Sequence, residues 1–244
     1  MPYLMGIDIG TSGTKTILID ETGHVHARAA AEYPLYSPQP QWSEQEPEDW
    51  WKAVCATVRE VLQSSGIEAR EINGIGLSGQ MHGSVFLDEG GRVLRRALLW
   101  NDQRTQAECA WITETVGKER VVELISNPVL TGFTAGKIIW LRNHEPETYA
   151  RVRKVLLPKD YIRFQLTGEY ATEVSDASGT ALFNVKQRVW ADEMLDAIGI
   201  PREWMPRCLE SPEISGRISE SAAALTGLAV GTPIVGGGGD HRLA

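Results

Sequence analysis

The sequence contains few cysteines, and none of them forms a recognisable motif. The 244 residues include only three cysteines, Cys55, Cys109 and Cys208, which lie far apart. No pair has the spacing of a metal-ligand or redox motif, so we expect free thiols, in the core or at the surface, of a protein in a reducing compartment.

Positive charge and long apolar runs are also scarce. Lys and Arg number 24 against 32 Asp and Glu, and the net charge of −8 argues against a general partner for nucleic acid or anionic membranes. Lys and Arg are scattered apart from short clusters such as Arg151–Lys154, which is interpreted as a solvated face. No apolar run approaches the length of a bilayer span. The N-terminus lacks a basic region, and Asp8 interrupts its apolar stretch, so no signal peptide is expected. These absences predict a cytoplasmic protein.

Strands and helices alternate along the chain, which predicts an α/β fold. With 42% hydrophobic residues, the chain can bury a sizeable core. A hairpin over residues 3–19 and a third strand from Val25 to Glu32 follow one another through short turns, so we expect an antiparallel meander within a mixed sheet. An amphipathic helix is predicted from Pro47 to Gly66. Further helices are expected at Thr105–Val116, Thr134–Arg142 and Lys159–Leu166, and further strands at Ile72–Leu77, Val85–Leu87, Ala97–Leu99 and Thr232–Val235.

The turn of the first hairpin is the most informative segment. It gathers a carboxylate, two hydroxyls and a lysine: Asp8, Thr11, Ser12 and Lys15. Gly10 and Gly13 let the backbone fold close against a ligand, and successive N–H groups in such a turn bind anions. Asp8, at the strand end, is well placed to hold a hydrated Mg²⁺. The segment is therefore interpreted as a phosphate-binding hairpin.

Two alternatives bear on this hairpin. It is not a P-loop, because the G-x-x-x-x-G-K-[ST] spacing is absent and the turn leads into a strand rather than a helix. An ordinary hairpin with a polar turn remains open on these residues alone, since Gly, Thr and Ser are common in turns.

A run of four glycines, Gly236–Gly239, precedes Asp240 near the end of the chain. Glycines pack no side chain, so such a run usually marks close approach to a ligand or to another backbone. The Asp240 carboxylate can orient and deprotonate an attacking hydroxyl. The alternative is a flexible linker at a domain edge.

Several polar loops follow predicted strands: Asp8–Thr14, Gln80–His82, Asn101–Arg104 and Asp240. Ligands of open α/β sheets bind at the carboxyl ends of strands, so we expect these loops to converge on one cleft. His82 is either a ligand contact or a structural histidine, and Met81 is interpreted as packing. Lys137 is expected to form a salt bridge or a carbonyl contact.

Taken together, these segments resemble the FGGY family of sugar kinases. The resemblance rests on Asp8–Lys15, Gly79–His82, Leu99–Asp102, Gly237–Asp240 and the signature-like segment Gly132–His144. It covers essentially the whole chain. Three further segments are similar to the branch of the family that acts on D-xylulose: Trp42–Gln45, Leu156–Tyr161 and Ser175–Thr180.

The resemblance implies a ribonuclease H-like fold of the actin/hexokinase superfamily, with a mixed central sheet flanked by helices. Members of the family are about twice as long, with two domains closing around a cleft. Residues 1–244 are therefore expected to form the N-terminal sugar-binding domain, with the C-terminal ATP-binding domain absent from this chain. His241 departs from the family pattern, which usually places Asn there, and its role is left open.

The implied reaction is ATP-dependent phosphorylation of D-xylulose to D-xylulose 5-phosphate, with Mg²⁺. Asp8 would order the metal and the phosphates, and Asp240 falls on the position of the catalytic base. Cofactor contacts are expected from Gly10, Thr11, Ser12 and Lys15, and sugar contacts from Met81, His82, Asn101 and Asp102.

Other functions stay open. Another family member acting on gluconate, glycerol or a different pentulose is the nearest alternative, although Met81 and His82 argue against glycerol kinase, which has an Arg-Glu pair there. A non-catalytic sugar-binding module is the alternative from another class. The expected partners are D-xylulose or a similar ketose and ATP, with a homodimer as a further option, and neither nucleic acid nor a membrane.

Overall fold

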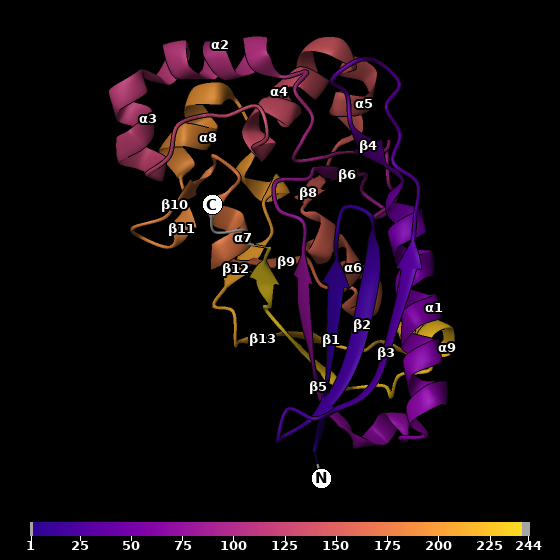
Figure 1. Cartoon of the computed structure of the whole chain (residues 1–244). Helices are drawn as coiled ribbons and strands as arrows, with labels where there is room; N and C mark the ends of the chain where they lie inside the picture. The colour runs from indigo at the N-terminus through magenta and orange to yellow at the C-terminus, as the bar shows by residue number, and fades with distance from the viewer. Residues whose placement is uncertain (1, 241–244) are drawn as a thin grey trace.

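The computed structural model describes residues 2–240, in which a seven-stranded mixed sheet forms the lower half of the molecule (Figure 1). The strands run in the order β13-β14-β5-β1-β2-β3, and β15 continues along β5 past β14. Their bounds are β1 Tyr3–Ile9, β2 Gly13–Asp20, β3 Val25–Glu32, β5 Ile72–Gly79, β13 Ile214–Arg217, β14 Pro233–Val235 and β15 Gly238–Gly239.

The first three strands form the predicted meander. β1 pairs antiparallel with β2, and β2 pairs antiparallel with β3. β1 pairs parallel with β5, as do β14 and β15, so the sheet is mixed as expected. Alternate residues of β1 (Met5, Ile7 and Ile9) are buried on one face, which is the period-two pattern of a strand packed on one side.

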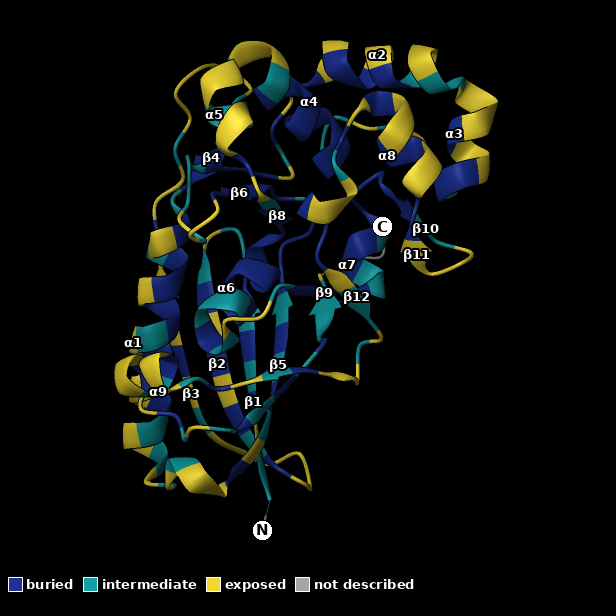
Figure 2. Ribbon diagram, turned by 180° about the vertical axis from the view of Figure 1, so that it is seen from behind, coloured by how far each residue is buried: buried dark blue, intermediate teal, exposed yellow. Residues whose placement is uncertain are grey.

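Three helices cover that face of the sheet: α1 Pro47–Ser65, α6 Pro158–Thr167 and α9 Glu220–Thr226 (Figure 2). Proline stands at the start of α1, and Gly66 ends it with a left-handed φ of 68°. Trp51, Val54 and Val58 of α1 are buried in the core shared with the sheet. The helix predicted from Pro47 to Gly66 is confirmed.

A second hydrophobic core lies in the upper part of the molecule, among α2 Gln106–Val116, α3 Lys118–Ile125, α4 Thr134–His144, α5 Pro146–Arg151 and α8 Asp192–Ile198 (Figure 1). The predicted helices of this part are confirmed within two residues at their ends. The short helices α3, α5, α7 (Val174–Ser178), α8 and α9 were not expected, because five to eight residues carry too little periodicity to be recognised.

Short strand pairs and single turns of 3₁₀ helix make up the rest of the regular structure in the described residues. The pairs are β4 Glu44–Gln45 with β7 Ala97–Leu98, β6 Val85–Leu87 with β8 Lys154–Leu156, β9 Ala171–Glu173 with β12 Arg207–Leu209, and β10 Phe183–Asn184 with β11 Val189–Trp190. The 3₁₀ turns lie at Ala69–Glu71 and Arg202–Trp204.

The cysteines and the basic cluster behave as the sequence predicts. Cys55, Cys109 and Cys208 are free thiols, and burial raises the pKa of each of them. Arg151 and Arg153 are exposed, which agrees with a solvated face. Between residues 2 and 240, no helix is both long and apolar enough to cross a membrane.

Candidate active site

Three parallel strands end at the same edge of the sheet, and each leads into a loop with polar residues. In the ladder, Asp8 of β1 lies beside Ser78 of β5, and Gly79 lies beside Gly239 of β15. The backbone N–H of Asp240 donates to the carbonyl of Gly79 at 2.9 Å. The topology therefore brings the ends of β1, β5 and β15 together, as the rule for open α/β sheets predicts.

Asp8 and Lys15 face each other across the first hairpin. They are direct partners in the antiparallel pairing of β1 and β2, and Lys15 is exposed. The hydroxyl of Ser78 donates to Asp8 Oδ1 at 2.8 Å, which orients the carboxylate. The hairpin thus presents a carboxylate and an ammonium group side by side.

Side chains from distant elements hold the hairpin turn in place. The Tyr33 hydroxyl donates to the carbonyl of Gly10 at 2.5 Å, and the Gln45 side-chain amide donates to the carbonyl of Thr11 at 2.7 Å. Trp100 Nε1 donates to Thr11 Oγ1 at 3.0 Å. Burial raises the pKa of Tyr33 above its ordinary value, so its hydroxyl remains a donor. The turn is therefore fixed from its carbonyl side.

The backbone N–H groups of the turn have fewer protein partners than its carbonyl groups. Gly10 N–H donates to the carbonyl of Gly13 at 3.1 Å and closes the turn. In the part of the chain that the structure describes, the N–H groups of Thr11 and Ser12 donate to no protein acceptor. Unpaired N–H groups at a glycine-containing turn are the donors that bind phosphate oxygens.

His82 occupies a strained and closely packed position. Its φ is 66°, which is uncommon for a residue other than glycine. Its Nδ1 lies 2.7 Å from the carbonyl oxygen of Gly179, and its ring stacks on Phe133 with centroids 4.7 Å apart. A Cβ atom on Gly179 would lie 2.4 Å from the imidazole, so only glycine fits there. The ring position is thus specified by its neighbours.

Lys137 of α4 supports the backbone of His82. Its side chain is completely buried, and Nζ donates to the carbonyls of His82 at 2.7 Å and Gly132 at 2.6 Å. Burial lowers the pKa of Lys137 to about 7, while the nearby charge of Asp102 opposes this change. The predicted carbonyl contact of Lys137 is confirmed.

Met81 packs on the glycine run. It is 8% exposed, and a Cβ atom on Gly239 would lie 2.8 Å from Met81 Cγ. Gly237 has a φ of 76°, and a Cβ atom there would lie 2.0 Å from the carbonyl oxygen of Leu77. The glycines therefore permit close approach to β5 and to Met81, as the sequence predicts. The alternative of a flexible linker does not hold, because Gly238 and Gly239 are a paired strand.

A cavity of about 740 Å³ opens where these segments meet. Its lining includes the residues predicted to bind phosphates, the pair predicted to bind sugar, and the predicted base: Asp8, Gly10, Thr11, Ser12, Lys15, Met81, His82 and Asp240. Asp240 is exposed and Asp8 is partly so. The expected convergence is confirmed for three of the four loops.

The fourth loop is placed differently. Asp102 is completely buried, and its Oδ2 accepts hydrogen bonds from the Ser43 N–H and from Arg104 Nη2, both at 2.7 Å. Asn101 lines a separate hollow of about 520 Å³ beside residues 35–43. The structure does not bring Asn101 and Asp102 into the cavity, and their contact with sugar stays a prediction.

Other residues at the cavity were not predicted as site residues. These are Tyr33, Gln45, Trp100, Phe133 and Gly179, which line the cavity or hold its walls. Tyr33 lies outside the segments that carry the family resemblance, whereas the other four lie within them, so that resemblance was the signal available for those four. His241 lies outside the described residues.

The side chains of this site suit Mg²⁺ only if most of its ligands come from phosphate and water. Within residues 2–240, no group of three or more His, Cys, Asp or Glu side chains is arranged to hold a metal ion. Asp8 is the carboxylate at the hairpin turn, and Mg²⁺ commonly uses one or two carboxylates together with phosphate and water oxygens. Asp8 therefore suits an ion that arrives with phosphates.

The fold and this site define a sugar-kinase domain, and comparison with known proteins agrees. Residues 3–244 match the model of the FGGY family of carbohydrate kinases, N-terminal domain. The chain belongs to the FGGY family.

Individual relatives are named as xylulose kinases. The chain is 42% identical over 241 residues to one from Bacillus subtilis, which covers 99% of this chain and 48% of that protein. It is 42% identical over 237 residues to one from Escherichia coli, which covers 97% of this chain and 48% of that protein. The crystal structure of a xylulose kinase from Rhodospirillum rubrum superimposes with a TM-score of 0.93 at 30% identity, covering 98% of this chain and 49% of that chain.

The chain thus spans about half the length of the relatives that it matches. The mixed sheet flanked by helices is the actin/hexokinase-like fold of the FGGY kinases, so the predicted fold class is confirmed.

Proposed function

We propose that this chain forms the sugar-binding side of an ATP-dependent kinase that converts D-xylulose to D-xylulose 5-phosphate. The observation that carries the proposal is the single cavity shared by the hairpin turn of Thr11 and Ser12, the pair Met81 and His82, and Asp240. A phosphoryl donor, an acceptor sugar and a base must meet in such a reaction, and one cavity of this chain offers groups for all three.

Asp240 is the proposed general base. Its carboxylate is open to the cavity, while its backbone is bonded to Gly79. A carboxylate in this position can accept the proton of the terminal sugar hydroxyl as the hydroxyl oxygen attacks the γ-phosphorus atom of ATP. Phosphoryl transfer depends mainly on positioning and charge neutralisation, so a weak base at a fixed position is sufficient.

The hairpin is the proposed phosphate side. The N–H groups of Thr11 and Ser12 are available to phosphate oxygens, and Lys15 adds a positive charge beside the turn. Asp8 would hold Mg²⁺, which when bound neutralises charge on the phosphates. Ser78 keeps the Asp8 carboxylate oriented toward this role.

Met81 and His82 are the proposed sugar side. The imidazole lines the cavity and can hydrogen-bond a ketose hydroxyl, while Met81 supplies an apolar wall between it and the glycine run. This pair favours D-xylulose or a similar ketose over glycerol. A domain beyond the one described here would supply contacts to adenosine, and we propose that the complete cleft forms between the two.

Calorimetry and an ADP-release assay on this chain test the proposal. We expect weak binding of D-xylulose, weaker binding of D-gluconate and glycerol, and no turnover by the chain alone. We expect D-xylulose-dependent ADP release once an ATP-binding domain of the family is joined to it.

Three outcomes would contradict parts of this proposal. Preferential binding of gluconate would assign another sugar. Sugar binding without ADP release in the joined protein would indicate a non-catalytic module. Turnover by the chain alone near an ordinary enzyme rate of ~10 s⁻¹ would show that no further domain is needed.

A further inference from the structure

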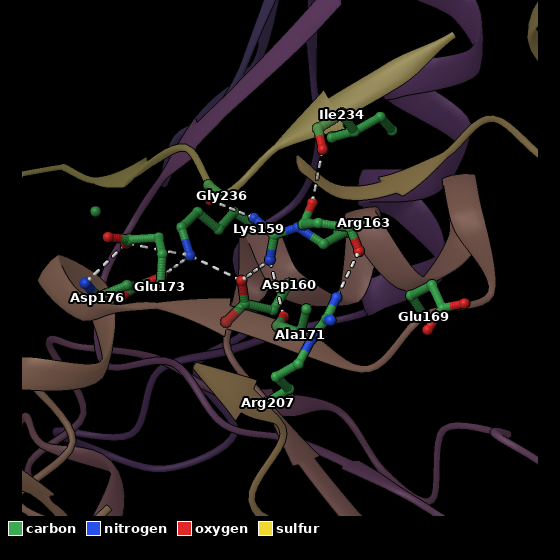
Figure 3. Close-up of polar contacts among 12 residues, drawn as sticks. Lys159, Asp160, Arg163, Glu169, Ala171, Glu173, Asp176, Arg207, Ile234 and Gly236 are labelled. Atoms are coloured by element: carbon green, nitrogen blue, oxygen red, sulfur yellow. Dashed lines mark hydrogen bonds and ion pairs between the residues drawn. The ribbon is translucent and has the colours of Figure 1, made fainter. Parts of the chain in front are cut away.

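Behind the glycine run lies a cluster of five charged side chains that the proposed chemistry does not use. Lys159, Asp160 and Arg163 come from α6, Glu173 ends β9, and Asp176 belongs to α7 (Figure 3). All five side chains have 0% exposure. Charged side chains are rarely buried so completely unless they are paired, so this ion cluster calls for a physical explanation.

The ion cluster is internally paired. Lys159 Nζ lies 2.7 Å from an oxygen of Asp160, 2.8 Å from one of Asp176 and 3.5 Å from one of Glu173. Arg163 Nη1 lies 2.6 Å from the same oxygen of Asp160. Burial alone would lower the pKa of Lys159, but Asp160 and Asp176 reverse that effect and raise it. A buried set of ion pairs seldom adds stability over apolar packing of the same volume, so the presence of this cluster points to a positioning role.

Two hydrogen bonds link the ion cluster and its neighbour Ser175 to the glycine run. Arg163 donates through Nη2 to the carbonyl of Gly236, at the start of the run, and through Nη1 to the carbonyl of Ala171 at 2.8 Å (Figure 3). At the other end, the hydroxyl of Ser175 accepts a hydrogen bond from the N–H of Gly239 at 3.0 Å. Gly239 immediately precedes Asp240.

Ser175 is itself fixed by the ion cluster. Its hydroxyl donates to Glu173 Oε1 at 2.8 Å, and its N–H donates to Glu173 Oε2 at 2.7 Å. The N–H of Asp176 also donates to Glu173, at 2.9 Å. The Glu173 carboxylate therefore sets the position of the Ser175 hydroxyl before that hydroxyl meets the glycine run.

Glycines cannot fix their own conformation, because they lack the side chain that restricts φ and ψ. The backbone that carries Asp240 therefore depends on external contacts. β5 supplies them on one side, through the pairing with Gly238 and Gly239. The carbonyls of Ser211 and Glu213 accept from the N–H groups of Gly237 and Gly236, and the ion cluster, with Ser175, supplies the remaining contacts. A base must be held within a fraction of an ångström of its productive position, so these contacts bear on function.

We propose that Ser175, held by the buried ion cluster, is a positioning residue that fixes Gly239 and hence the carboxylate of Asp240. This inference rests on the proposed function of Asp240. Ser175 is not part of the cavity lining, and it acts only through the backbone that it holds.

The test compares Ser175→Ala with Ser211→Ala in the 244-residue chain. Ser211 donates its hydroxyl to Glu173 at 3.2 Å, so its variant also removes one hydrogen bond to that carboxylate but leaves the side-chain contact to Gly239 intact. Glycine-selective ¹⁵N labelling reports the exchange rate of the Gly239 amide, and calorimetry reports the affinity for D-xylulose. Thermal unfolding checks that the two variants are equally stable.

We expect Ser175→Ala to speed exchange of the Gly239 amide about tenfold and to weaken D-xylulose binding by a comparable factor, since one hydrogen bond is lost. Ser211→Ala should leave both quantities near wild type. Unchanged exchange or unchanged D-xylulose affinity in Ser175→Ala, or an equal change in both variants, would overturn the proposal. If the wild-type chain does not bind D-xylulose, the proposed function fails, while the exchange measurement still shows whether Ser175 holds the Gly239 amide.

Discussion

The carboxylates of this protein fall into two groups that differ in solvation and in partners. Asp8 and Asp240 line the cavity and are open to solvent, and each is positioned through strand β5. Asp160, Glu173 and Asp176 lie in the ion cluster, fully buried and paired with Lys159. In the proposed function the first group exchanges protons and meets phosphates, whereas the second orients Arg163 and Ser175, which hold the glycine run.

The difference explains how a reactive carboxylate is kept both accessible and fixed. A buried base would have a desolvated charge, and an exposed base on a free loop would lack a defined position. Here the charge of Asp240 remains in the cavity, and the buried charges lie one layer behind it. They hold Gly236 through Arg163 and Gly239 through Ser175. Substitutions in the two groups should therefore affect different properties.

The largest expected effect is the loss of catalysis in Asp240→Asn. The amide keeps the shape but cannot accept the proton, so phosphorylation should fall by ~10²–10⁴-fold in the protein joined to an ATP-binding domain. Stability should be unchanged, because Asp240 is exposed and its backbone bond to Gly79 remains. An ADP-release assay and a thermal unfolding curve measure the two effects. A rate loss below about tenfold would exclude a base role.

Lys159→Met should mainly lower the stability of the folded chain. Removing the ammonium group leaves Asp176 buried without its cation and removes one of the two cations beside Asp160. Breaking a buried ion pair lowers the free energy of unfolding by about 3–5 kcal/mol. Urea unfolding of the chain measures this loss. The exposed Lys186 offers a matched control, and Lys186→Met should change stability by less than about 0.5 kcal/mol. Equal stability of the two variants would mean that the ion cluster carries no such energy.

A smaller effect is expected at the sugar side, in His82→Ala. Loss of a hydrogen bond from the imidazole to a ketose hydroxyl should weaken D-xylulose binding by about 1–3 kcal/mol, with ATP affinity little changed. Calorimetry with each ligand separates the two. His24→Ala, at an exposed histidine of the β2–β3 turn, should leave sugar affinity unchanged. The same sugar affinity in both variants would show that His82 is purely structural.

The sequence could predict the hairpin, the meander and the main helices, because these rest on local periodicity and on turn residues such as Gly10 and Gly13. It also indicated that Asp240 ends a close-packed segment. It could not predict that Asp102 faces Ser43 and Arg104 instead of the cavity, because the loop direction depends on tertiary contacts.

Local sequence patterns did not predict the ion cluster either. Its members lie on α6, β9 and α7, and the lysine, arginine and carboxylates of those segments read as ordinary charged residues. Only the packing of α6 against the sheet and against the start of the glycine run shows that they are buried. Burial of charge is a tertiary property, which single-sequence patterns do not contain.

The smallest expected effect is a pH dependence of the free energy of unfolding that differs between the two groups of carboxylates. Burial raises the pKa of Asp176 to about 7, although Lys159 opposes the change, while an unfolded Asp titrates near 4. Between these values the folded state holds a proton that the unfolded state has lost. The contribution of Asp176 to stability is therefore complete below pH ~4, declines as the pH rises to about 7, and stays constant above that.

Asp176→Asn mimics the protonated carboxyl and does not titrate, so its stability relative to wild type should improve as the pH rises through this window. The slope of the difference should not exceed about 1.4 kcal/mol per pH unit, the value for one proton. Urea unfolding of both proteins between pH 5 and pH 8, a window chosen around the pKa of about 7, measures it. Asp8→Asn, at the partly exposed carboxylate of the cavity, is measured over the same range as the comparison. A flat difference for Asp176→Asn would show that the buried carboxyl is already ionised at pH 5, and that desolvation does not raise its pKa.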